Sequence, residues 1–510
     1  MMHLTDLPPE ILSLIGDKLD AHGTFDTMPT IRNLLCVSHF CHRSFRHLLW
    51  RRVTIRGKTS LSGLSVLKAY AHLVLYLHFE QRAKNEFFQL DFPHLVFFRC
   101  DLEKLHYFQS LGRTTTTNPM YKHEDLLATL SDFISRHATI QDLVITTQNV
   151  FLTQQLWDTI STTLQTPRRL VINGLTLDME AGPETKGPGF WRACTQFQDI
   201  TYSGSDQLDY LDLEDYDFSG LKRLSYTTQT ENTPKLWMWM CRCPNLTRFH
   251  WGGNILLQQV AAVAELPDWP FLEEFSLGGD VHGSDEDLAR ILSCLYPLKH
   301  LRLTSGDFGQ VCFSILRERH FDSLKTLAAQ GGGLLSSQMA LEVLQGCAHL
   351  EEFRANKINL RDLRSSPQPW VCLGLKHLQV TFASDPRDPD ADSIMFDQLS
   401  RLTRLEVLDM KSYGSISTGL PSFAKASPAW RVENGLLQLS TLTQLRVFRI
   451  QKYARGRIME WRVDDFEWML DHWPKLEVLC GNFAWRSAIT EERVEDRIMS
   501  LIKQRGVRTY

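Results

Sequence analysis

Histidine and cysteine side chains are the residues of this sequence whose spacing could do chemistry, because they are the usual ligands of zinc. Cys241 and Cys243 lie two residues apart and His250 follows them, but no second pair stands at ligand spacing. A second group near the N-terminus consists of Cys36, His39, Cys41, His42 and His47. Arginines surround this group, which favours a solvated basic face of a short helix. We therefore expect no metal site and no cofactor.

Nucleotide binding and nucleophilic catalysis have no better support. Gly57-Lys58-Thr59 resembles the end of a phosphate-binding loop, but that loop needs a glycine where this sequence has Arg52. No HExxH, GxSxG or glycine-rich dinucleotide motif is present, and no Cys–His pair stands out as a nucleophile and its base. We expect a protein that is not an enzyme.

Composition limits the class of protein. Of 510 residues, 43% are hydrophobic and 22% charged, which is typical of globular domains. Lys and Arg number 55 against 59 Asp and Glu, and a net charge of −4 provides no basic footprint for nucleic acid or an anionic membrane. No long apolar window or signal peptide is present, and the 11 cysteines are an odd number. We expect an intracellular protein, cytoplasmic or nuclear, with reduced thiols and no membrane partner.

One three-point pattern, apolar-x-x-apolar-x-apolar, recurs from about residue 140 to the C-terminal end. Successive copies begin 24 to 31 residues apart, with one gap of 40, close to the roughly 20–29 residues of a leucine-rich repeat. The copies begin at Ile140, Pro167, Phe197, Leu221, Leu246, Leu272, Leu298, Leu324, Leu350, Leu375, Leu405, Leu445 and Leu476. The pattern predicts one parallel strand per repeat, with the apolar positions in a shared core.

An apolar residue also stands three positions before each copy, except at His137. Four of these positions are Cys194, Cys243, Cys347 and Cys372, which we predict to pack as small apolar side chains. Helices are predicted between the strands at Asp125–Ile134, Leu152–Leu164, Ile255–Leu266, Asp285–Leu295 (with Ser284 as its N-cap), Gln310–Arg319 and Gln338–Leu344. The prediction is an α/β leucine-rich-repeat solenoid with parallel strands on the concave face and helices on the convex face. It resembles the cysteine-containing repeats of ubiquitin-ligase receptors.

Residues that alternate with the buried strand positions line the concave face. Among its ionisable residues, basic ones outnumber acidic ones, and the candidate substrate-binding residues are Arg223, Arg248, His250, His300, Arg302 and Arg354. Arginine donors suit carboxylate and phosphate groups, so an acidic or phosphorylated segment held by Arg248, Arg302 and Arg354 is one hypothesis. The alternative is an ordinary solvated strand face.

The first fifty residues predict three short helices. Leu7, Ile11, Ile15 and Leu19 recur every four residues after two prolines, which suit a helix start. The segment closely resembles an F-box, with LPPEIL, then LLCVS, then LLW at the exit. F-boxes dock on the Skp-type adaptor of the SCF (Skp–cullin–F-box) ubiquitin ligase. The resemblance implies adaptor contacts by Leu7, Pro8, Ile11, Leu12, Ile15, Leu19, Leu35, Val37 and Trp50.

The two resemblances together imply an F-box and leucine-rich-repeat substrate receptor similar to fungal F-box families. Its partners would be the Skp-type adaptor, a cullin through that adaptor, and a protein substrate that the sequence does not identify. Four alternatives stay open: an N-terminal helix that only caps the solenoid, a scaffold without a ligase role, a sensor of nucleic acid or small ligands, and, last, an enzyme. The family's V-C-basic-x-W motif is replaced here by Val37-Ser38-His39-Phe40-Cys41, which supports the scaffold.

Four segments are predicted. Residues 1–50 are the F-box, and residues 51–139 are a transition with degenerate first repeats, including strands at Leu73-Leu75-Leu77 and at Leu95-Val96-Phe97-Phe98. Residues 140–485 are the solenoid. Residues 486–510 are a C-terminal capping helix and tail.

Overall fold

The computed structural model describes residues 50–55, 62–79, 85–103, 123–148, 152–175, 188–204, 213–228, 233–261, 269–306, 308–329, 335–383, 390–410, 430–450, 462–480 and 492–509. The chain divides into two compact units, Met1–Cys243 and Pro244–Tyr510. The predicted adaptor contacts from Leu7 to Val37 lie outside the described residues.

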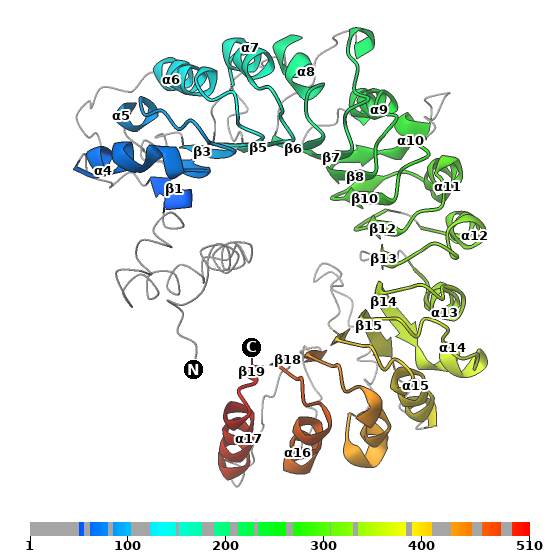
Figure 1. Cartoon of the computed structure of the whole chain (residues 1–510). Coiled ribbons are helices and arrows are strands. Elements are labelled where there is room, and N and C mark those ends of the chain that lie inside the picture. The colour runs from blue at the N-terminus through cyan, green and yellow to red at the C-terminus, as the bar shows by residue number, and fades with distance from the viewer. Residues whose placement is uncertain are drawn as a thin grey trace, which may run out of the picture. The chain divides into compact units, whose positions relative to one another are not determined.

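The described part of the first unit is a parallel sheet with helices packed on one side (Figure 1). Each strand pairs with the next one along the chain. The strands are β1 (Arg52–Ile55), β2 (Tyr76–Phe79), β3 (Phe97–Glu103), β4 (Asp142–Gln148), β5 (Arg169–Leu175), β6 (Asp199–Gly204) and β7 (Arg223–Thr228). The helices are α4 (Ser62–Tyr70), α5 (Asn85–Phe88), α6 (His123–Ser135), α7 (Gln154–Thr163), α8 (Pro188–Cys194) and α9 (Thr233–Cys241), with short 3₁₀ turns η2 (Ala71–Leu73) and η4 (Leu213–Asp215).

The second unit repeats this plan. Its parallel sheet runs through β8 (Arg248–Gly253), β10 (Glu274–Gly278), β12 (His300–Leu303), β13 (Thr326–Ala329), β14 (Glu352–Asn359), β15 (His377–Ala383), β16 (Val407–Met410), β17 (Val447–Ile450), β18 (Val478–Cys480) and β19 (Arg508–Thr509). The helices are α10 (Leu257–Ala261), α11 (Asp285–Cys294), α12 (Gln310–Arg319), α13 (Ser337–Gly346), α14 (Leu360–Ser365), α15 (Asp390–Ser400), α16 (Val463–His472) and α17 (Glu492–Gln504), with 3₁₀ turns η5 (Val432–Asn434) and η6 (Leu436–Thr441). Each repeat therefore contributes one strand to the sheet, and most contribute a helix to the other layer.

The core is made by the apolar positions of the repeat. Every described position of the three-point pattern from Ile140 to Leu479 is buried, and neighbouring strands hold these positions in register, as Phe275 beside Leu301 and Leu327 beside Phe353 illustrate. This confirms the predicted α/β leucine-rich-repeat fold. Apolar and polar residues alternate along each strand, so the apolar side chains face the core and the polar ones lie on the opposite face of the sheet.

The position three residues before each copy is also buried. Cys194, Cys243, Cys347 and Cys372 are buried and form no disulfide, as predicted. Burial raises the pKa of each of the last three far above its ordinary value, to about 12 for Cys372. Burial therefore favours the protonated form of Cys243, Cys347 and Cys372, and all four thiols pack in the core as small side chains.

Helix α12 has the predicted bounds, whereas α7 begins at Gln154 instead of Leu152, with Thr153 as its N-cap, and α6 begins at His123 instead of Asp125. Ser284 and Asp287 form a reciprocal capping box at the start of α11, because each side chain accepts the other's backbone N–H. The helix predicted to begin at Ile255 begins instead at Leu257. Ile255 and Leu256 form strand β9 (Ile255–Leu256), which pairs in parallel with β11 (Val281–His282). Their backbone groups pair with this neighbouring strand and not with a helix.

The three-point spacing is also present within residues 51–139, where degenerate first repeats were predicted. Leu95, Phe98 and Cys100 are buried at the three-point spacing in β3, and Val74, Leu77 and Phe79 are buried at the same spacing around β2. The predicted strand at Leu73-Leu75-Leu77 is correct for Leu77 and wrong for Leu73 and Leu75, which are half-buried and precede β2. The sheet begins at Arg52.

Buried polar side chains link the repeats. His137 Nε2 accepts the Phe92 backbone N–H at 2.8 Å, and its Nδ1 donates to the Phe133 carbonyl. In the second unit, His320 Nδ1 accepts the Leu298 N–H at 3.1 Å, and Gln398 Oε1 accepts the Trp370 N–H at 2.9 Å. Each side chain satisfies a backbone donor of the preceding repeat that would otherwise be buried without a partner.

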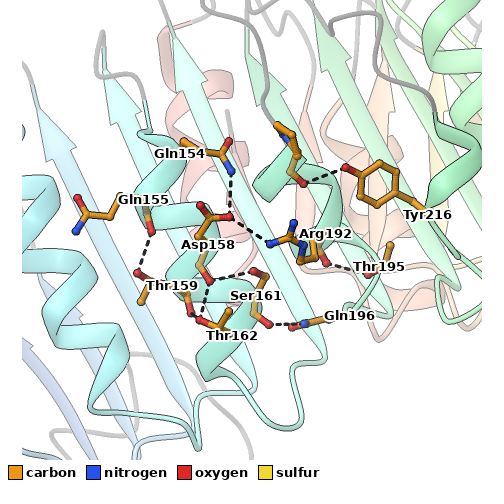
Figure 2. Close-up of polar contacts among 11 residues, drawn as sticks. Gln154, Gln155, Asp158, Thr159, Ser161, Thr162, Arg192, Thr195, Gln196 and Tyr216 are labelled. Carbon is orange, nitrogen blue, oxygen red and sulfur yellow. Dashed lines mark hydrogen bonds and ion pairs between the residues drawn. The ribbon is translucent and has the colours of Figure 1, made fainter.

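Polar contacts also join neighbouring helices of the first unit (Figure 2). The Asp158 carboxylate of α7 accepts from Gln154 at 3.0 Å and lies 3.6 Å from Arg192 of α8. The Gln196 amide donates to the Ser161 carbonyl. These polar groups hold neighbouring helices together. The strand face is therefore the better candidate for a binding surface.

The C-terminal residues complete the second unit. Helix α17 lies in the predicted capping segment, and Arg508 donates its backbone N–H to the Glu477 carbonyl at 2.8 Å. The tail thus adds strand β19 to the edge of β18.

Candidate partner-binding face

The strand face of the second unit holds two rows of outward-pointing side chains. Parallel register places Arg248, Glu274, His300, Thr326 and Glu352 in one row across five strands. The neighbouring row runs His250, Ser276, Arg302, Ala328 and Arg354. Five of the six predicted substrate-binding residues therefore lie on one continuous face.

The first part of this face contains balanced polar pairs. Arg248 Nε lies 3.6 Å from Glu274 Oε2, so opposite charges meet on adjacent strands. His250 Nδ1 and Ser276 Oγ are 2.9 Å apart, and His300 Nδ1 and Thr326 Oγ1 are also 2.9 Å apart. Each histidine is held by a hydroxyl on the next strand.

The two histidines carry no charge at pH 7. Burial lowers the pKa of His250 below its ordinary value of 6.5; Glu274 opposes this shift, and Arg302 adds to it. Burial likewise lowers the pKa of His300, again opposed by Glu274 and reinforced by Arg302. A neutral imidazole beside arginine is the form that this arrangement favours.

The second part of the face centres on Glu352. Its Oε1 lies 2.6 Å from Arg354 Nε, and its Oε2 lies 3.4 Å from Arg302 Nη2. One carboxylate thus contacts two guanidinium groups. The hypothesis from sequence grouped Arg302 and Arg354 with Arg248, and the structure adds that both share an acidic partner.

Arg223 is the sixth predicted residue and belongs to the first unit. It lies in a row with Asp142, Arg169 and Asp199. Asp199 Oδ2 lies 3.7 Å from Arg223 Nη1 and 3.9 Å from Arg169 Nε. Arg223 is therefore part of an alternating set of charges in the first unit.

Sequence reasoning missed a second polar cluster on the first unit's strand face. Asp101 Oδ2 lies 2.7 Å from His78 Nε2, and Asp101 Oδ1 lies 3.0 Å from Arg99 Nε. Beside them, the Arg52 guanidinium stacks over the Tyr76 ring at 4.7 Å. The pattern of Leu95, Phe98 and Cys100 would have revealed these outward positions had it been followed upstream of residue 140.

Trp50 is the one predicted adaptor contact among the described residues. Its ring stacks on Tyr70, the last residue of α4, with centroids 4.6 Å apart and planes 11° apart. Trp50 also stands three residues before Val53 and five before Ile55, the spacing of the repeat. The ring is half-buried, and its contact with an adaptor stays a prediction.

The cysteine pair that could suggest a metal site or a nucleophile has strongly raised pKa values. Burial raises the pKa of the Cys241 thiol to about 12 and raises that of Cys243 further. No set of three or more His, Cys, Asp or Glu side chains in these stretches could hold a metal ion. None of their helices is long and apolar enough to cross a bilayer.

Comparisons with known proteins return structural likeness only. No protein-family model matches the chain, and no curated protein matches it in sequence. A chain of the yeast Rad7 and Elc1 complex shares 13% identity, with a TM-score of 0.38, and the match covers 81% of this chain and 91% of that one. An internalin from Listeria monocytogenes shares 12% identity, with a TM-score of 0.34, over 89% of this chain and 94% of that one. The fold assignment rests on the register and burial described above.

Proposed function

We propose that this chain is the substrate-recognition subunit of an SCF-type ubiquitin ligase. The observation that carries the proposal is the order of its parts. An F-box-like sequence from Leu7 to Trp50 is followed at Arg52 by the first strand of a leucine-rich-repeat solenoid. A segment suited to an adaptor is thus joined to a large binding surface without an intervening linker.

In this proposal the chain binds two proteins and does no chemistry itself. Residues 1–50 would dock on the Skp-type adaptor and, through it, reach a cullin. The solenoid would hold a target protein, so that a lysine of the target and the ubiquitin thioester meet at a raised effective concentration. The assembly would act in the cytoplasm, the nucleus or both.

The first half of the proposal rests on apolar contacts. Burying one Leu or Ile side chain contributes about 1.5–3 kcal/mol, so the stripe of Leu7, Ile11, Ile15 and Leu19 could hold a stable interface. A three-helix module of about fifty residues is also too small to bury all of its own apolar surface. Docking on an adaptor would cover that surface.

The test is co-purification with the Skp-type adaptor and a cullin. The intact chain is compared with an Ile11→Asp, Ile15→Asp double variant, in which charges in the contact should cost several kcal/mol. A Val311→Asp, Met499→Asp variant is the matched control, because it adds the same charge at exposed positions of α12 and α17. We expect stoichiometric capture by the intact chain and the control only. Equal capture by all three, or capture by none at micromolar concentrations, would refute the proposal.

A scaffold without a ligase role is the second candidate. The replacement of the F-box Cys and Trp by Ser38 and Cys41 favours it. A chain that folds, binds a target and captures no adaptor would have this function.

A further inference from the structure

Three strands of the second unit bring two arginines to either side of an alanine. Register pairs Arg302 with Ala328, and Ala328 with Arg354, so the three residues form one row across β12, β13 and β14. Strands in a sheet lie about 4.8 Å apart, which sets the two arginines roughly 10 Å apart at the backbone. The alanine methyl group leaves space above the middle strand into which both guanidinium groups can reach.

Glu352 forms ion pairs with both arginines. It stands in the neighbouring row and contacts Arg354 at 2.6 Å and Arg302 at 3.4 Å. The Glu352 side chain is only 14% exposed, whereas those of Arg302 and Arg354 are 45% and 42% exposed. The carboxylate therefore anchors the arginines while their remaining N–H donors face solvent.

Among the residues that the structure describes, the charges around this group do not balance. Arg302 and Arg354 carry two positive charges against one negative charge on Glu352. Nearby acids are already engaged, since Glu274 pairs with Arg248, and Asp409 lies 3.2 Å from Arg449. One positive charge is left on a preorganised pair of planar donors.

We propose that Arg302 and Arg354 form a clamp for a single carboxylate, supplied by an aspartate or glutamate side chain within an extended segment of the bound protein. The clamp deepens the proposed function and rests on it for the nature of the partner. Each guanidinium presents parallel N–H donors that match the two oxygens of a carboxylate, and two such groups held in place lose little entropy on binding.

The charge and the openness of the face select this occupant. A monoanion neutralises the excess of one charge, whereas a phosphate dianion would leave a negative charge beside Glu352. The row continues to Ser276 on one side and to Gln379 on the other, so a chain can pass across the clamp in both directions. An internal acidic residue suits such a face better than a chain end.

The test uses the full chain and pools of twelve-residue synthetic peptides with randomised flanks. The central residue is fixed as Glu, Asp, Gln or phosphoserine. Because a charge-assisted pair contributes enough for about a tenfold change in affinity, we expect the Glu and Asp pools to bind the native chain about tenfold better than the Gln pool. An Arg302→Gln, Arg354→Gln variant should reduce this ratio to about one.

The matched control is Arg317→Gln. Arg317 lies in α12 of the same region and pairs with Glu342 of α13 at 3.3 Å on the helix layer. This variant should keep the native ratio. A ratio near one for the native chain, an unchanged ratio in the double variant, or a phosphoserine pool that binds tenfold better than the Glu pool would overturn the clamp.

Removing the anchor reverses the preference. A Glu352→Gln variant leaves two positive charges unbalanced, so we expect it to bind the phosphoserine pool better than the Glu pool. An unchanged order would contradict the charge argument. Adaptor capture is measured on the same preparations and should be equal for all these variants. Failure of capture with an intact Glu-to-Gln ratio would remove the ligase role and leave the clamp standing.

Discussion

The strand faces of the two units share one repeat geometry but arrange charge differently. In the first unit, Asp142, Arg169, Asp199 and Arg223 alternate along one row, and acids equal bases. Among the described residues of the second unit's face, Arg248, Arg302 and Arg354 pair with two glutamates, Glu274 and Glu352. The first unit's row neutralises itself, whereas these five residues, which span two rows of the second unit, retain one positive charge.

The cores of the two units, in contrast, are alike. Both bury the same three-point pattern, and both use an enclosed histidine to satisfy a backbone N–H of the preceding repeat, His137 in one and His320 in the other. Packing constrains the buried positions, while outward positions are free to change. The difference between the units should therefore be seen in binding, and their similarity in stability.

The largest effect is expected from removing a core histidine. In an H320A variant, the Leu298 N–H loses its acceptor and the Leu292 carbonyl its 3.3 Å donor, and a cavity is left. An unsatisfied buried group and a cavity together should cost about 3 kcal/mol of unfolding free energy, measured by urea denaturation. An H137A variant should cost a similar amount.

Hydrogen exchange locates each effect. Protection should fall in the second unit for H320A and in the first unit for H137A. Exposed His349 provides the control, because H349A should change neither unfolding nor exchange. A cost below about 1 kcal/mol for both core variants would contradict the shared role of these histidines.

Acid should expose the same dependence. Burial lowers the pKa of His320 to about 4; a backbone hydrogen bond to Leu292 opposes this shift, and Arg319 adds to it. In the unfolded chain the pKa of His320 has its ordinary value of 6.5. Between pH 6.5 and pH 4 the unfolded chain therefore binds more protons than the folded one, so stability is lost as the pH falls through this range. The loss from His320 alone should be about 2 kcal/mol at pH 5.

Comparing the native chain with a His320 variant isolates the contribution of this histidine to the pH dependence of stability. Unfolding free energies of the native chain and of an H320Q variant are measured at pH 7 and pH 5. Carboxylates titrate equally in both proteins, so the variant should lose about 2 kcal/mol less than the native chain. Equal losses would show that His320 does not stay neutral in the folded protein.

A smaller effect separates the two faces directly. An Arg169→Gln, Arg223→Gln variant removes the arginines that flank Asp199, as the clamp variant removes those around Glu352. Because the row of Asp142, Arg169, Asp199 and Arg223 has no excess charge, we expect this variant to keep the native Glu-to-Gln peptide ratio. The clamp variant should lose about tenfold, or roughly 1.4 kcal/mol. Equal losses in the two variants would end the distinction between the faces.

The sequence predicted the parallel sheet because the apolar spacing fixes which residues face the core. The prediction failed from Leu73 to Leu77, because successive apolar residues there fit more than one alternation of buried and exposed positions. It also failed at Ile255, where pairing with a neighbouring strand overrides the helix propensity. The outward rows also followed from the spacing. The spacing did not predict that Arg302 and Arg354 share Glu352 as a partner. That contact depends on side chains that reach across two strands over Ala328. The F-box positions from Leu7 to Val37 stay predictions.

The smallest expected effect compares the two acids that lie between arginines. Glu352 contacts its arginines at 2.6 and 3.4 Å, whereas Asp199 lies 3.7 and 3.9 Å from its own and is more exposed. Solvent weakens the looser set, so E352Q should cost about 1 kcal/mol of unfolding free energy and D199N about 0.3 kcal/mol. Urea denaturation at low and high salt checks both values, and high salt should reduce the cost of E352Q less, since its carboxylate is better shielded from ions. A larger cost for D199N would mean that the alternating row, and not the clamp, is the better organised of the two faces.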